Sequence, residues 1–120
     1  LSEPGRAIAA TSVTLVTTVL GKSLRDGKIW YYLDDGLYST FSGIVYDHCQ
    51  YQVVTLEEQQ PHLSVLAGPT CDSFDVMYDG LMIPEHEVGD RIIFLATGAY
   101  CAVSGSNFNG LRRPAYMVVE

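Results

Sequence analysis

The sequence lacks several features that mark broad classes of protein. Among its 120 residues, 14 are acidic and only 7 are lysine or arginine, which gives a formal charge of −7. Nucleic acids and anionic membrane surfaces would be repelled at long range, so neither is an expected partner. The longest apolar stretches, residues 8–20 and 91–103, are interrupted by threonine, glycine or charge. Neither stretch therefore predicts a membrane span.

Paired cysteine spacing is also missing. Cys49, Cys71 and Cys101 are odd in number and show no paired pattern. A disulfide framework is not expected, and a reducing, cytoplasmic compartment is favoured. The histidines, cysteines and glutamates show neither C-x-x-C nor H-E-x-x-H spacing, so no metal site is predicted. We expect His86, which lies between two glutamates, to be in a solvated loop.

No secretory signal, internal repeat or low-complexity segment is recognisable. The chain starts without methionine inside Leu1-Ser2-Glu3-Pro4-Gly5-Arg6, so we expect it to be a fragment of a longer protein. Nearly half of the residues are apolar, enough to bury the core of one domain.

Strand patterns dominate, and helical periodicity is almost absent. An Asp26-Gly27 turn predicts an antiparallel hairpin between the first two strands, and Asp79-Gly80 predicts a turn within residues 76–84. Arg6 begins one helical turn. The predicted strands are residues 13–20, 28–33, 43–47, 52–56, 62–67, 91–96 and 115–119. This pattern predicts an all-β fold: an antiparallel Greek-key β-barrel or sandwich of six or more strands, with a short helical turn near the N-terminus.

The segment Gly68-Pro69-Thr70-Cys71-Asp72-Ser73-Phe74-Asp75 delivers a thiol and a carboxylate at the end of a predicted strand. Its local sequence favours a plain loop with a half-buried cysteine. Acidic neighbours oppose thiolate formation, so Cys71, if it acts, is better suited to donate a proton than to attack as a nucleophile.

Two aspartates and one arginine are further candidates for a site. Asp47 and Asp72 each lie at the end of an apolar run, where a pair of carboxylates could hold an ammonium group or each could cap a turn. Arg6 beside Gly5 could bind an anion, typically phosphate, through its guanidinium and a backbone N–H.

Several motifs, in this order, resemble one enzyme family. They are Ser2-Glu3-Pro4-Gly5-Arg6, Asp35-Gly36-x-Tyr38, Tyr46-Asp47-His48, Gly68-Pro69-Thr70-Cys71-Asp72-x-x-Asp75, Gly98-Ala99-Tyr100 and Phe108-Asn109-Gly110. The chain resembles the pyridoxal-phosphate-dependent ornithine, lysine, arginine and diaminopimelate decarboxylases of the alanine-racemase-like fold type. Cys71-Asp72 resembles the ornithine or lysine branch.

This resemblance implies a domain organisation. Residues 1–10 would be the remnant of the loop after the last strand of an N-terminal (β/α)8 barrel, and residues 11–120 the C-terminal β-domain. The barrel would carry the lysine that forms the Schiff base, so the chain alone would not be catalytic.

The resemblance also implies roles on the cofactor, pyridoxal 5'-phosphate. Glu3 would pair with the pyridine nitrogen, and Gly5, Arg6 and Tyr100 would bind the phosphate. The negative charge of Glu3 would keep the ring protonated and able to accept electrons.

Other residues would act on a small cationic amino-acid substrate. Asp47 and Asp72 would bind its distal ammonium, with Tyr38 nearby, and Cys71 would protonate the carbon left after carbon dioxide departs. The Cys71-Asp72 loop and Tyr38 would reach the cofactor of the second subunit of a homodimer. We expect Phe108 near that interface.

We expect Asp75 to form an ion pair between the subunits. The implied function is the decarboxylation of ornithine, lysine or both to a diamine in cytoplasmic polyamine synthesis. The alternatives are a decarboxylase-like regulatory protein without turnover, a member of the diaminopimelate or arginine branch, and a β-domain used only for association.

Overall fold

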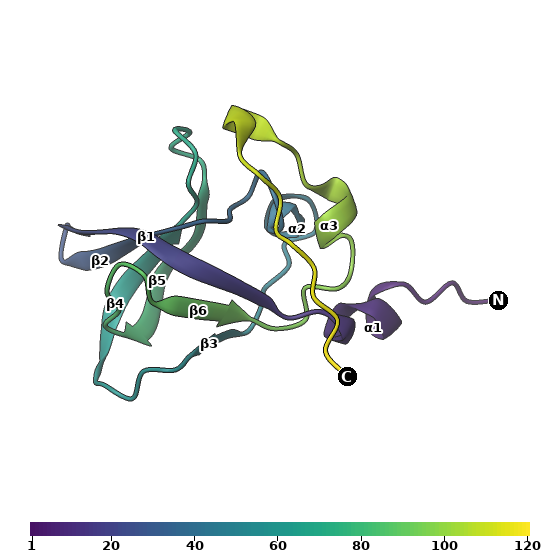
Figure 1. The fold of residues 1–120 in the computed structure, drawn as a ribbon, viewed down its shortest axis with the longest axis horizontal. Helices are drawn as coiled ribbons and strands as arrows, with labels where there is room; N and C mark the ends of the chain where they lie inside the picture. The colour runs from purple at the N-terminus through teal and green to yellow at the C-terminus, as the bar shows by residue number, and fades with distance from the viewer.

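Six strands form along the β-branched and aromatic runs of the chain, of which the computed structural model describes residues 1–120 (Figure 1). Their bounds are β1 (Leu15–Arg25), β2 (Lys28–Leu33), β3 (Val53–Thr55), β4 (Pro61–Ala67), β5 (Val76–Pro84) and β6 (Arg91–Phe94). They belong to one sheet in the order β3-β6-β1-β2-β4-β5, which curls into a nearly closed barrel. The all-β barrel predicted from the sequence is confirmed.

The β1–β2 hairpin is the predicted one. Asp26 and Gly27 have φ values of 49° and 75°, the left-handed geometry that a two-residue hairpin turn requires. One pairing differs from the expected antiparallel pattern, because β2 and β4 run parallel. A parallel pair needs a long crossover, which here is the segment that carries β3 and a short helix.

A tyrosine side chain joins the two edges of the sheet. The Tyr78 hydroxyl on β5 donates to the Tyr51 carbonyl at 2.9 Å and accepts from the Tyr51 N–H at 2.8 Å. Tyr51 lies just before β3, so this contact joins β5 to the start of β3 at the point where strand pairing would otherwise close the barrel. The two edge strands are held together without a shared strand pairing.

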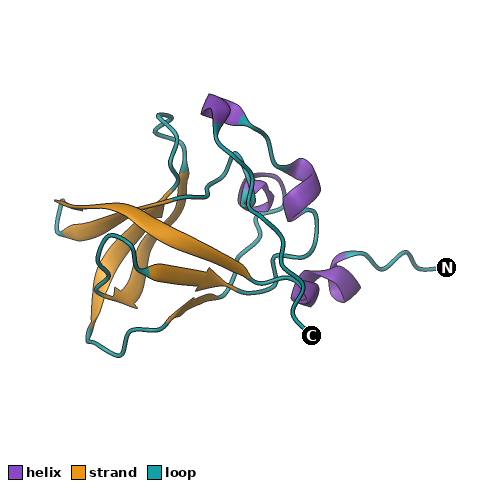
Figure 2. Ribbon diagram, in the orientation of Figure 1, coloured by secondary structure: helices purple, strands orange, loops and turns teal.

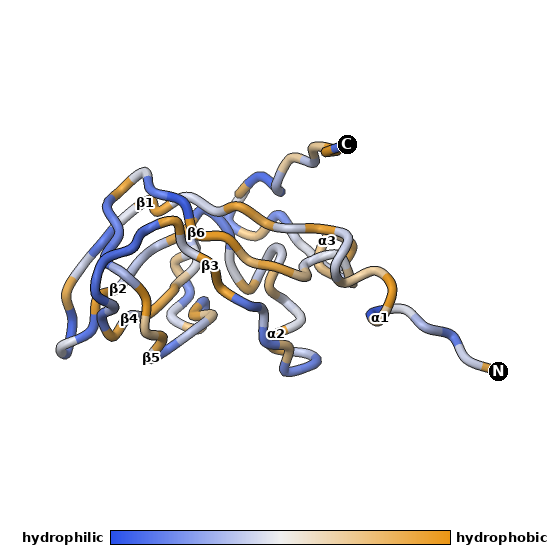
Figure 3. Tube along the Cα trace, turned by 90° about the horizontal axis from the view of Figure 1, so that it is seen from below, coloured by the Kyte–Doolittle hydropathy of each residue, from blue (hydrophilic) through white to orange (hydrophobic).

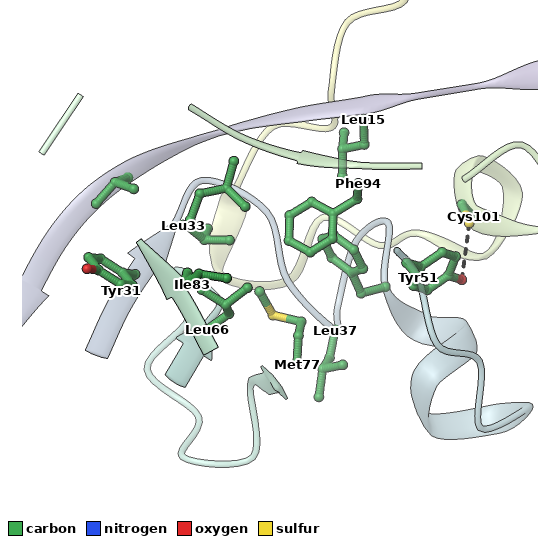
Figure 4. Close-up of a cluster of buried hydrophobic side chains, with 13 residues drawn as sticks. Leu15, Tyr31, Leu33, Leu37, Tyr51, Leu66, Met77, Ile83, Phe94 and Cys101 are labelled. Carbon is green, nitrogen blue, oxygen red and sulfur yellow. Dashed lines mark hydrogen bonds between the residues drawn. The ribbon is translucent and has the colours of Figure 1, made fainter. Parts of the chain in front are cut away.

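The barrel interior is a cluster of 13 buried residues, mostly aliphatic and aromatic (Figure 4). The alternation of β1 directs Leu15 and Val19 inward. Phe94 on β6 packs edge-on against Phe41, with ring centroids 4.6 Å apart. This core gives the loops at the barrel end a fixed support.

Short helices gather toward one end of the barrel (Figure 2). They are α1 (Arg6–Ala9), η1 (Ala10–Ser12), α2 (Ser42–Tyr46), α3 (Cys101–Ser104) and η2 (Phe108–Gly110). The prediction of a strand over residues 43–47 is wrong, because this segment forms α2. Ile44 and Val45 are adjacent in sequence yet both pack on the core, which helical geometry permits and strand alternation opposes.

Two further predictions from sequence are corrected. Asp79-Gly80 is an irregularity within β5 rather than a reversal, since the pairing with β4 shifts register there and Gly80 has a φ of 92°. His86 is 0% exposed rather than solvated. Its Nδ1 lies 2.7 Å from the Pro84 carbonyl oxygen, and its ring packs edge-on against Tyr31.

The C-terminal segment stands away from the barrel (Figure 3). Residues 115–119 pair with no strand of the chain, so the strand predicted there is absent. Tyr116, Met117, Val118 and Val119 are exposed. Elsewhere in the fold, none of the helices has the length and hydrophobicity required to cross a membrane.

Candidate functional site

The loop between β4 and β5 is organised around the carboxylate of Asp75. Its Oδ1 accepts from the Leu37 N–H at 2.8 Å, and its Oδ2 accepts from the Thr70 hydroxyl at 2.7 Å and from the Thr70 N–H at 3.2 Å. The backbone N–H of Gly68 donates to the Asp75 carbonyl at 2.8 Å. Asp75 therefore ties together both ends of the loop and the neighbouring segment at Leu37.

The ion pair expected for Asp75 across a subunit interface stays a prediction, beside the contacts that Asp75 makes within its own chain. The residue is 2% exposed, and both carboxylate oxygens are bound by donors of the same chain. A carboxylate so enclosed is satisfied locally. Asp75 shapes the loop that presents Cys71 and Asp72.

The structure brings four of the candidate residues into one group, which we call the thiol loop cluster: Tyr38, Cys71, Asp72 and Phe108. The Tyr38 hydroxyl donates to Asp72 Oδ2, and Asp72 Oδ1 accepts from the Phe74 N–H at 2.9 Å. The Phe108 ring stacks on the Tyr38 ring, with centroids 4.4 Å apart. Cys71 is the exposed one of the three free cysteines.

The contacts within this cluster favour an ionised Asp72. The hydrogen bond from Tyr38, and next the one from the Phe74 N–H, hold the pKa of the Asp72 carboxyl below its usual value. The same contact with Asp72 raises the pKa of the Tyr38 hydroxyl. Asp72 is thus presented as an anion, the form that binds a cationic group.

A second group, the anion cluster, forms where α1, α2 and α3 meet. It contains Gly5, Arg6, Asp47 and Tyr100. Arg6 Nη2 donates to Asp47 Oδ2 at 2.8 Å, and the Arg6 guanidinium carbon lies 5.4 Å from the centre of the Tyr100 ring. A β-carbon on Gly5 would stand 2.7 Å from the Tyr100 hydroxyl oxygen, so any other residue would require the Tyr100 side chain to shift.

Local structure explains how α2 positions Asp47. Asp47 caps the C-terminal end of α2, and its N–H donates to the Gly43 carbonyl at 3.0 Å. Its side chain projects into an open hollow of about 660 Å³ that Arg6, Tyr46 and Tyr100 also line. Carboxylate, guanidinium and phenol therefore face one space.

Glu3 is the one candidate that joins neither cluster. It precedes α1 in an extended, exposed stretch and makes no hydrogen bond or ion pair within the chain. Figure 1 shows this stretch leading away from the barrel. Glu3 lies three residues before Arg6 in the sequence, and no contact within the chain holds its carboxylate in one position.

Hydrogen bonds connect the segments that carry the two clusters. The Ser42 and Ser104 hydroxyl oxygens are 2.6 Å apart, and the Ser106 N–H and hydroxyl each donate to the Tyr38 carbonyl at 2.8 Å. The loop from α3 to η2 therefore bridges the anion cluster and the thiol loop cluster.

The anion cluster fits the phosphate of pyridoxal phosphate on the chain's own geometry. The Arg6 guanidinium and the Tyr100 phenol line one open hollow, and Gly5 lies beside the Tyr100 hydroxyl. A larger hollow of about 760 Å³, between β1 and residues 111–119, contains none of the candidate residues. By its donors rather than its volume, the first hollow is the one that fits a phosphate group.

The barrel fold, with both clusters of candidate residues at one end, defines the class of protein as a β-barrel domain. Residues 8–98 match the family described as pyridoxal-dependent decarboxylase, C-terminal sheet domain, and the chain belongs to this family. The lysine/ornithine decarboxylase of Selenomonas ruminantium is 42% identical over 119 residues, which are 99% of this chain and 30% of that protein.

Solved structures give the same relationship. The lysine/ornithine decarboxylase from Vibrio vulnificus, complexed with cadaverine, matches with a TM-score of 0.89 and 44% identity, over 92% of this chain and 31% of the other. An arginine decarboxylase from Paramecium bursaria Chlorella virus, bound to agmatine, matches with a TM-score of 0.86 and 34% identity, over 92% and 32%. This chain spans about 30% of the length of the curated relatives it matches.

One residue that contacts the thiol loop cluster, Asn109, was not among the residues predicted from the sequence. Asn109 donates from its side-chain amide to Cys71 Sγ at 3.3 Å. The Phe108-Asn109-Gly110 motif drew attention to this turn, but only Phe108 was given a role. A contact across 38 residues leaves no periodic signal in a single sequence.

Proposed function

We propose that this chain is the C-terminal β-domain of a pyridoxal-phosphate-dependent decarboxylase that converts lysine, ornithine or both to the diamine. The observation that carries the proposal is the sorting of the candidate residues into two clusters, one suited to phosphate and one to a cation and a proton. Membership of the family and relatives named lysine/ornithine decarboxylase support it.

In the complete protein, an N-terminal (β/α)8 barrel would supply the lysine that holds the cofactor, as the matched fraction of the relatives favours. Arg6, the Gly5 backbone and the Tyr100 hydroxyl bind the phosphate, and Glu3 pairs with the pyridine nitrogen. Bound pyridoxal phosphate accepts the electron pair released when carbon dioxide leaves. The chain's own residues orient the cofactor and the substrate around that event.

Asp47 and Asp72 bind the distal ammonium of the substrate. Asp72 is already held as an anion by Tyr38. Asp47 forms an exposed ion pair with Arg6, which contributes little to stability. When the cofactor phosphate binds the Arg6 guanidinium, the Asp47 carboxylate becomes available to the substrate ammonium. Cys71 gives its thiol proton to the substrate carbon that has lost carbon dioxide.

The two clusters serve different subunits of a cytoplasmic homodimer. Glu3, Arg6, Asp47 and Tyr100 act on the cofactor of their own subunit. Cys71, Asp72 and Tyr38 reach the cofactor of the partner, with Phe108 at the interface. A two-fold axis gives each of the two sites one cluster from each chain.

The experiment is a substrate panel on the complete protein. Purified protein should retain pyridoxal phosphate and release carbon dioxide from lysine, ornithine or both, with less from arginine and diaminopimelate. One methylene separates lysine from ornithine, which limits their discrimination to about 10–200-fold. Retention of no cofactor, or no carbon dioxide from any of the four, contradicts the proposal and favours a binding protein without turnover.

A further inference from the structure

The turn at η2 contacts two different residues of the thiol loop cluster at once. Phe108 stacks on Tyr38, and the next residue, Asn109, donates its amide to Cys71 Sγ at 3.3 Å. Tyr38 in turn donates to Asp72. One turn therefore supports both the carboxylate and the thiol of the loop.

The backbone of this turn is defined by its own hydrogen bonds. The Gly110 N–H donates to the Asn107 carbonyl at 2.9 Å, and the Phe108 N–H donates to the Ser106 hydroxyl at 3.3 Å. Ser106 is anchored on the Tyr38 carbonyl. The turn is thus fastened to the same segment that carries Tyr38.

Asn109 has left-handed backbone angles, with φ 56° and ψ 16°. Glycine adopts this region most readily, and asparagine tolerates it better than most other residues. A glycine would satisfy the turn but would bring no donor to the sulfur. Asparagine provides both the conformation and an N–H directed at Cys71.

We propose that Asn109 is a positioning residue for proton donation by Cys71, an inference that rests on the proposed function. The amide N–H occupies one side of the sulfur, so the thiol's own proton is directed elsewhere, toward the open face of the loop. In the transfer, the S–H bond breaks, a C–H bond forms at the substrate carbon, and the electron pair stays on sulfur. The amide stabilises the thiolate that results, which solvent reprotonates.

The need for such a donor follows from the charges around Cys71. Asp72 follows Cys71 in the loop, and the buried Asp75 closes the same loop. Carboxylates near a thiol in general oppose the formation of its thiolate. Asn109 offers the sulfur a neutral N–H donor that offsets them without adding a competing acid.

The first readout is the alkylation rate of Cys71 by iodoacetamide at a fixed pH near neutrality, followed by mass spectrometry of its peptide in the complete protein. The thiolate is the reacting form, so its loss slows labelling. Asn109→Gly keeps the turn and removes the amide, and we expect labelling to slow about three-fold. Asn109→Asp keeps the size but replaces the donor by a carboxylate, and labelling should slow further.

The matched control is Asn107→Ala in the same turn. The Asn107 side chain accepts from Arg113 Nε at 3.2 Å and does not contact the sulfur. Its removal should leave the labelling rate of Cys71 unchanged. Equal or faster labelling in both Asn109 variants overturns the proposal, as does an equal slowing in Asn107→Ala.

The second readout is a double-mutant cycle on diamine formation. Asn109→Gly should lower kcat several-fold with little change in KM, and should have no further effect in a Cys71→Ala background. An equal loss in both backgrounds contradicts action through the thiol. The labelling experiment needs no turnover, so it can be read even if the substrate panel fails. Slowed labelling of the Asn109 variants in a protein without decarboxylase activity would contradict the proposed function but not the effect of Asn109 on Cys71.

Discussion

Replacing Cys71 with alanine is expected to slow diamine formation by at least about 100-fold, or to divert protonation to a wrong carbon, while cofactor binding stays intact. General acids that transfer a proton to the reacting atom typically contribute factors of this size. The structure supports the role because Cys71 is exposed at the end of a loop fixed by the buried Asp75. No other thiol shares that loop.

The measurement compares diamine and other amine products of the two proteins, together with the absorbance of the bound cofactor. Cys49→Ala is the control, because Cys49 lies outside the thiol loop cluster, and its product rate should stay near that of the unmodified protein. Unchanged product kinetics in Cys71→Ala would remove the thiol from the reaction. Loss of the cofactor in this variant would show that the substitution acts on folding instead.

Gly68→Ala is expected to destabilise the folded chain by about 2–4 kcal/mol, the combined size of overpacking and of weakened hydrogen bonds to a charged group. A β-carbon at this position would come closer than 3.0 Å to both carboxylate oxygens of Asp75. Asp75 is 2% exposed and bound by Leu37 and Thr70, so it cannot swing aside without losing these contacts.

Urea unfolding followed by the fluorescence of Trp30, the single tryptophan of the chain, gives the free energy of unfolding. Gly21→Ala in β1 is the matched control, since its β-carbon would meet nothing closer than 3.4 Å. It should change the free energy of unfolding by less than about 1 kcal/mol. Equal stability of Gly68→Ala and Gly21→Ala would contradict the organising role of Asp75.

Local sequence patterns predicted a strand correctly where its pairing partner is adjacent in the chain. The β-branched run of β1, the Asp26-Gly27 turn and β2 form a hairpin whose partners are adjacent in the chain. Residues 115–119 have a similar composition, yet they have no partner strand in the chain and remain irregular. Strand formation depends on pairing, which composition alone does not reveal.

Short apolar runs were the weak point of the prediction. Five residues at 43–47 are too few to distinguish a strand from a helical turn, and packing of Ile44 and Val45 on the core decided for α2. Likewise, the flanking glutamates of His86 suggested solvent, whereas its side chain is enclosed beside Tyr31. Both errors come from contacts between distant parts of the chain.

The sequence named candidate site residues, but it did not predict how they are arranged. Resemblance to the family pointed to Arg6, Asp47, Cys71, Asp72 and Tyr100, and the structure sorts them into two clusters. The burial of Asp75 and the contact between Asn109 and Cys71 depend on how loops meet at the barrel end. Contacts between such distant loops leave no recognisable spacing in the sequence.

The central claim, that the two clusters of one chain act on different cofactors of a dimer, is tested by a mixed dimer. The two variants, Arg6→Ala in the anion cluster and Cys71→Ala in the thiol loop cluster, are each impaired alone. Co-expressed with different affinity tags and purified as a heterodimer, they should regain about half of the unmodified activity, because one of two sites is then intact. A heterodimer no more active than its two parents would contradict the account.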